Sequence, residues 1–98
     1  MLNTTLSPHT IVKKGWGYEQ WICNFEKYCG KILVFNPNKK CSLHFHEIKD
    51  EVLHVDDGNI DLIYCWDAKS DNRQKIKLSK GMSFHIPTGL IHQMIAGK

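Results

Sequence analysis

Three histidines and a glutamate stand at spacings that suit a metal site: His44, His46, Glu51 and His92. Imidazole nitrogens and a carboxylate are common ligands of divalent transition metals. Side chains alternate between the two faces of a β-strand, so His44 and His46 would share a face, roughly 6.5–7 Å apart. The pattern predicts two convergent imidazoles, with Glu51 and His92 arriving from other strands.

The residues around these four define the expected surroundings of the site. Residues 47–50 read as a turn before a strand that Glu51 opens, and Asp50 is the alternative carboxylate ligand. By alternation, His54 points away from the face of Glu51, while Met94 shares the face of His92. The expected lining is mostly apolar, as in small-molecule pockets. It includes residues such as Phe45, Leu53 and Met94 or their opposite-face neighbours.

Short runs of β-branched and aromatic residues separated by turn residues predict an all-β chain with negligible helix. The predicted strands cover 18–23, 31–35, 42–46, 51–55, 59–66, 73–78, 82–86 and 91–95. Turn signals fall at 36–38, 57–58, 70–72, 80–81 and 87–89, and Asp57-Gly58 is typical of a hairpin. Many short antiparallel strands indicate a sandwich or a small barrel.

Composition restricts the class of protein. A chain of 98 residues, 42% of them hydrophobic, is expected to form a single globular domain over 1–98, with 1–14 as an N-terminal lead-in. A net charge of +3 without a basic run does not favour nucleic-acid binding. No secretory segment or membrane span is evident. The four cysteines form no CxxC pair and are expected to be reduced, which suggests a cytoplasmic protein.

Two sequence motifs resemble those of the cupin superfamily. The first motif is a glycine, five residues, HxH, three or four residues, Glu, six residues and Gly. Residues 38–58 match it at His44, His46, Glu51 and Gly58, with Asn38 in place of the first glycine. Asparagine also adopts the left-handed conformation readily, so the replacement is mild.

The second cupin motif is a glycine, five residues, Pro-x-Gly, two residues, His, three residues and Asn. Residues 81–96 match it at Gly81, Pro87, Gly89 and His92, with Ala96 at the final Asn. The resemblance implies a small jelly-roll barrel that binds one divalent metal through His44, His46, Glu51 and His92. It does not fix the reaction, because one fold hosts many chemistries. The metal could be Fe, Mn, Ni, Zn or Cu.

A softer resemblance concerns the first predicted strands. Residues 14–19, Lys-Gly-Trp-Gly-Tyr-Glu, followed by 30–34, look like the cupin domain of type II mannose-6-phosphate isomerases and small stand-alone cupins of bacteria and phages. That resemblance implies a sugar-phosphate ligand.

Several functions remain open on these residues. A metal-dependent enzyme would polarise an oxygen of a sugar phosphate or of a hydroxy or keto acid, in an isomerase-like reaction, or with iron act as a dioxygenase. Its catalytic base is unknown, and Tyr18, Lys31 and His85 are the candidates. The alternatives are a non-catalytic module that binds a ligand and a structural module.

A homodimer is expected as well. The chain stops six residues after His92, which would leave an edge strand incomplete, and open edges are usually covered. Trp16 and Trp21 are the aromatic residues expected on the exposed surface.

Overall fold

The structure, a computed structural model, describes residues 10–67, 69 and 72–98, and the expected turn at 70–72 lies partly outside them. The described residues form strands and no helix, which confirms the all-β prediction. In chain order the strands are β1 (Thr10–Lys14), β2 (Gly17–Asn24), β3 (Cys29–Phe35), β4 (Glu51–His54), β5 (Asn59–Cys65), β6 (Gln74–Ser79), β7 (Ser83–Ile86) and β8 (Ile91–Ala96).

The chain divides into two compact units, residues 1–35 and 36–98. The single domain over 1–98 stays a prediction. None of the described residues belongs to a helix long and apolar enough to cross a membrane.

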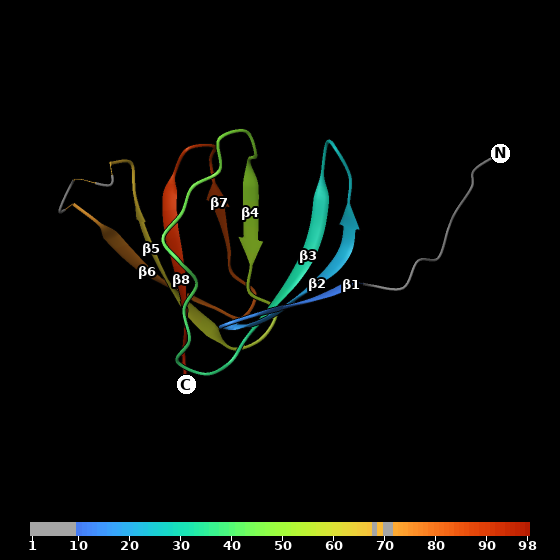
Figure 1. The fold of residues 1–98 in the computed structure, drawn as a ribbon. Coiled ribbons are helices and arrows are strands. Elements are labelled where there is room, and N and C mark those ends of the chain that lie inside the picture. Colours follow the sequence, from blue (N-terminus) through green and yellow to red (C-terminus); the bar gives the residue numbers. More distant parts are fainter. Residues whose placement is uncertain (1–9, 68, 70–71) are drawn as a thin grey trace. The chain divides into compact units, whose positions relative to one another are not determined.

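The first unit is an antiparallel sheet in the order β1-β2-β3 (Figure 1). Within the expected lead-in over 1–14, residues Thr10–Lys14 form strand β1, which pairs with β2. Its run of three β-branched residues, Thr10 to Val12, is too short to stand out in the sequence. Residues 1–9 lie outside the described part of the chain.

The second and third strands approach each other closely at Gly17, which pairs with Phe35. A Cβ atom there would lie 1.9 Å from the Val34 carbonyl oxygen, so only glycine fits. The neighbouring Trp16 ring stacks on Phe35, with 4.1 Å between the centroids. Trp16 and Trp21 are half-buried, contrary to expectation. Among the described residues of this unit, the exposed large apolar ones are Ile11, Tyr18, Ile22, Phe25, Tyr28 and Ile32.

The second unit contains two small antiparallel sheets, β4-β7 and β6-β5-β8. Its buried apolar core includes Leu62 of β5, Ile86 of β7 and Met94 of β8, which are 0%, 1% and 7% exposed. Each fully buried side chain of this kind stabilises the fold by about 1.5–3 kcal/mol. Leu62 and Met94 pair directly, so the core lies on the face of β8 that also carries His92.

The segment before β4 runs alongside β8 (Figure 1). The predicted strand over 42–46 is wrong, because this segment meets β8 in two isolated bridges, Lys40↔Ile95 and His44↔His92. Four steps from Lys40 to His44 oppose three steps from Ile95 to His92, so the register slips by one residue. The Gln93 side chain also donates to the Cys41 carbonyl over 2.8 Å, which interrupts the ladder.

Two turn predictions have different outcomes. Asn38 has a φ of +63°, which confirms the left-handed conformation expected at the position of the first motif glycine. Asp57-Gly58 turns the chain with a φ of +78° at Gly58, but the hairpin is wrong. Strand β4 pairs with β7, whereas β5 pairs with β6 and β8, so this turn connects two sheets.

Candidate metal centre

The first pair of histidines is fixed by the backbone. The His44 amide donates to the His92 carbonyl over 3.0 Å, and the His92 amide donates to the His44 carbonyl over 2.8 Å. These reciprocal bonds hold the loop and β8 in register at the two histidines. The rings consequently lie side by side, with 4.3 Å between their centroids.

The same two rings are oriented through their Nδ1 atoms. His44 Nδ1 lies 2.7 Å from the Ser42 carbonyl oxygen, and His92 Nδ1 lies 2.9 Å from the Leu90 carbonyl oxygen. A carbonyl only accepts, so each Nδ1 carries the hydrogen and each Nε2 has a free lone pair. Metal-bound histidines are typically oriented by such an outer hydrogen bond.

His92 is the buried polar residue of the described core, with 1% of its surface exposed. Its Nε2 atom is buried and has no hydrogen-bond partner. Unsatisfied buried polar atoms are rare and costly, so this lone pair is suited to a ligand. Burial lowers the pKa of His92, despite the opposing hydrogen bond to Leu90, so the ring stays neutral as a metal requires.

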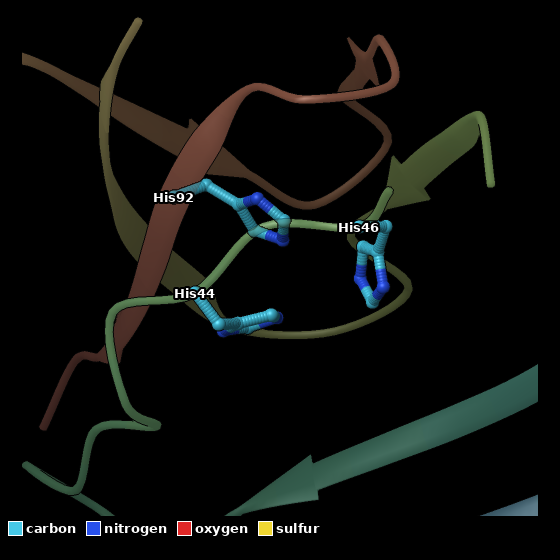
Figure 2. A group of neighbouring side chains, drawn as sticks. All are labelled: His44, His46 and His92. Carbon is cyan, nitrogen blue, oxygen red and sulfur yellow. The ribbon is translucent and has the colours of Figure 1, made fainter. Parts of the chain in front are cut away.

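His46 completes the cluster from the same loop as His44. The ligand nitrogens of His44, His46 and His92 all lie within 4.8 Å of one another. Figure 2 shows the three rings close together, His44 and His46 from the loop before β4 and His92 from β8. Three imidazoles at this separation could hold one transition metal ion.

Glu51 enters the cluster through His46. Its Oε1 atom contacts His46 Nε2, and Glu51 is the first residue of β4, paired with Ile86 of β7. His46 is anchored at its backbone, where its carbonyl accepts the Gly89 amide over 2.9 Å. The structure therefore brings together His44, His46 and His92, with Glu51 in contact with His46.

Cys41 modifies the cluster from its buried side. A hydrogen bond with the Cys41 side chain raises the pKa of His44; burial opposes this shift, and the Ser42 carbonyl adds to it. The Cys41 sulfur also accepts the Met94 amide over 3.3 Å. This thiol is thus a neighbour of the cluster and outside the group of three ligand atoms.

The remaining site candidates lie elsewhere. His85 is exposed on β7, and its Nε2 lies 2.8 and 2.9 Å from the two Asp50 carboxylate oxygens. Asp50, the alternative carboxylate ligand, is therefore hydrogen-bonded to His85. Lys31 and Tyr18 belong to the first unit, where Lys31 Nζ lies 4.7 Å from the centroid of the Trp21 ring. Both stay candidates by residue type alone.

The residues expected to line a cavity differ in burial. Met94 is buried and Leu53 is half-buried on the face of Glu51, whereas His54 is exposed as predicted. Phe45 is 52% exposed and lies between His44 and His46 in the sequence, so its exposure fits the alternative in which the opposite-face neighbours form the lining.

Some functional atoms were beyond sequence reasoning. The Ser42 and Leu90 carbonyls that orient two rings are backbone atoms, which residue type does not reveal. Each stands two residues before its histidine, and that spacing is the one available signal. The hydroxyl of Thr88 inside the Pro-x-Gly turn was also missed, because its partners lie forty residues away along the chain.

Comparison with known proteins supports the fold. No family model matches the chain, and no curated protein matches it. Among solved structures, the Drosophila melanogaster CENP-C cupin domain matches with a TM-score of 0.77 at 15% sequence identity. The match covers 90% of this chain and 65% of that one, so the chain spans about two-thirds of the neighbour's length.

The fold and the cluster together define the class. The chain has an all-β, small cupin-type fold, as the two motifs predicted. Within it, three histidines from both motifs stand where a metal ion could be held. The likeness at 15% identity concerns the fold alone and carries no activity with it.

Proposed function

We propose that this chain is a metal-binding cupin that holds one divalent transition metal on His44, His46 and His92, with Glu51 as the fourth ligand. The observation that carries the proposal is the buried His92 Nε2, which lacks a partner and lies among the other two imidazoles. An apolar residue would fill this core position without that cost. A metal ion would satisfy the lone pair.

The proposed ligand is a small sugar phosphate or a hydroxy or keto acid. When bound, the metal supplies a Lewis acid with room for oxygen ligands, because four protein ligands leave two positions of an octahedral ion open. The carbonyl partners of His44 and His92 fix each neutral ring in the tautomer whose Nε2 carries the lone pair. The resemblance of residues 14–19 to mannose-6-phosphate isomerases supports a sugar phosphate.

The second candidate function is binding without turnover. Of the base candidates in the second unit, His85 is exposed and tied to Asp50, which leaves Glu51 as the acidic group beside the described histidine cluster. If Glu51 binds the metal, no second carboxylate adjoins the cluster among the described residues. This arrangement supports a ligand-binding module, and an iron-dependent dioxygenase, which needs no such base, is the third candidate.

Metal titration of chelator-treated protein tests the metal site. We expect one Mn²⁺, Ni²⁺ or Zn²⁺ per chain by isothermal titration calorimetry, and loss of binding in the His44→Ala, His46→Ala double variant. The control is His54→Ala, which removes an exposed histidine of β4 that lies outside the cluster and outside the 47–50 loop. Equal binding by the double variant and the control would show that the metal lies elsewhere.

A second experiment separates enzyme from binding module. Metal-loaded protein is incubated with mannose 6-phosphate and with a panel of 2-keto acids, and both binding and product are measured. Turnover that disappears with chelator and in His92→Ala supports the enzyme. Binding without product under the same conditions supports the module, and oxygen consumption in the iron-loaded sample supports the dioxygenase.

A further inference from the structure

The loop of residues 47–50 joins two groups of the cluster, since His46 precedes it and Glu51 follows it. The loop has little to hold it in place. All four residues are exposed, and the side chain of Ile48 is 89% exposed, so no apolar anchor fixes it. Among the described residues, the backbone–backbone hydrogen bonds outside the strands include none from 47–50.

Thr88 supplies the missing hydrogen bonds. Its hydroxyl donates to the carbonyls of Ile48 and Lys49 over 3.3 and 3.1 Å, a shared bond to two successive peptide groups. The next residue, Gly89, donates its amide to the His46 carbonyl over 2.9 Å. The turn at 87–89 therefore holds the loop both at its start and in its middle.

The two halves of the cluster differ in how they are fixed. His44 and His92 are held by reciprocal backbone bonds, which no side-chain substitution removes. Between His46 and Glu51, in contrast, the loop depends on side chains: the Thr88 hydroxyl and the exposed pair of Asp50 with His85. Both interactions are exposed. The hydroxyl differs from the pair because it bonds to the backbone of the loop, at two successive carbonyls.

We propose that Thr88 is a positioning residue of the metal centre, which sets the placement of His46 and Glu51 through the 47–50 loop. This inference rests on the proposed metal-binding function. Residues that orient metal ligands without touching the metal typically change affinity by about 10–100-fold when they are lost. The Thr88 hydroxyl bonds to the carbonyls of Ile48 and Lys49, which lie two residues from His46 and from Glu51. We therefore expect a change in metal affinity at the lower end of that range.

The test compares metal affinity in three variants by titration with Ni²⁺. Thr88→Val keeps the shape and removes the hydroxyl, and it should bind about 10-fold more weakly. Thr88→Ser keeps the hydroxyl and should bind as the wild type does. The control is Ser83→Ala, which removes another exposed side-chain hydrogen bond, Ser83 Oγ to His54 Nδ1 at 2.8 Å, at the other end of the β4-β7 pair.

A structural role alone would lower the midpoint of thermal unfolding of the chelated protein, whereas a positioning role lowers affinity at an unchanged midpoint. In a His46→Ala background, the further loss from Thr88→Val should shrink to about threefold or less, because the two residues act on the same ligand. If Thr88→Val does not fold, Thr88→Ala takes its place.

Equal affinity of Thr88→Val and wild type, or an equal loss in Ser83→Ala, would overturn the positioning role while leaving the metal site intact. A wild-type protein that binds no Ni²⁺, Mn²⁺ or Zn²⁺ would overturn the proposed function itself. The two failures are therefore distinguishable within one set of titrations.

Discussion

The decisive atoms of the account are the ring nitrogens of two histidines. Each Nδ1 is committed to a carbonyl two residues earlier, so each Nε2 is left with a lone pair. At His92 this lone pair is buried without a partner. A protein that bound nothing there would keep a costly group in its core.

Substitution of His92 tests that cost directly. His92→Met removes the unsatisfied nitrogen but also leaves the Leu90 carbonyl without its donor. Because the two effects oppose each other, we expect the free energy of unfolding of chelated protein to change by less than about 1 kcal/mol. Urea unfolding measures this. Leu62→Ala, at a fully buried apolar position, should instead cost about 2–5 kcal/mol.

Metal affinity should fall with decreasing pH, and His44 should set where the fall begins. A metal binds the unprotonated ring, and the hydrogen bond with Cys41 raises the pKa of His44 above its ordinary 6.5. His44 therefore takes up a proton while His92, whose pKa is lowered by burial, is still neutral. Metal affinity is highest at pH values well above the raised pKa of His44, and it declines as the pH falls through that pKa.

Substitution of the cysteine checks this assignment. Cys41→Ala removes the group that raises the pKa most, so the midpoint of the pH dependence should move to lower pH. Titrations with Ni²⁺ between about pH 5 and 8 bracket the histidine range. A midpoint that stays in place in Cys41→Ala would contradict the role of the thiol.

At the scale of elements, the sequence predicted most strands and the proximity of three histidines but misplaced the connections between strands. The HxH pair faces one way, as alternation requires, yet its segment is no strand because the register slips by one residue against β8. Asp57-Gly58 turns the chain as its residue types dictate. Which strands it joins depends on long-range pairing, which local sequence does not encode.

The close approach of the paired strands β2 and β3 at Gly17 gives a prediction at this scale. Gly17→Ala should destabilise the protein by about 1–3 kcal/mol, because the new methyl group would overlap the Val34 carbonyl and the φ of +152° disfavours a side chain. Gly15→Ala is the control, since no atom lies within 4 Å of its Cβ position. Chemical denaturation of both variants measures the difference, and equal losses would refute the steric explanation.

At the scale of the whole molecule, we propose a homodimer. The sheet of the first unit exposes apolar side chains, and Ile11 and Ile32 both pair with Gln20, so they share one face with Tyr18. Exposed apolar faces of sheets are commonly covered by a partner. We expect sedimentation equilibrium at micromolar concentration to give twice the chain mass of 11.4 kDa, and Ile32→Asp to give the monomer.

The coordination shell itself tests the central claim most directly. X-ray absorption at the metal edge of Ni²⁺- or Zn²⁺-loaded protein reports the atoms bound to the ion. The account predicts a shell of nitrogen and oxygen ligands with the multiple scattering of three imidazoles, reduced to two in His92→Met. A shell that contains sulfur, or that keeps its imidazole count in His92→Met, would contradict a site built on His44, His46 and His92.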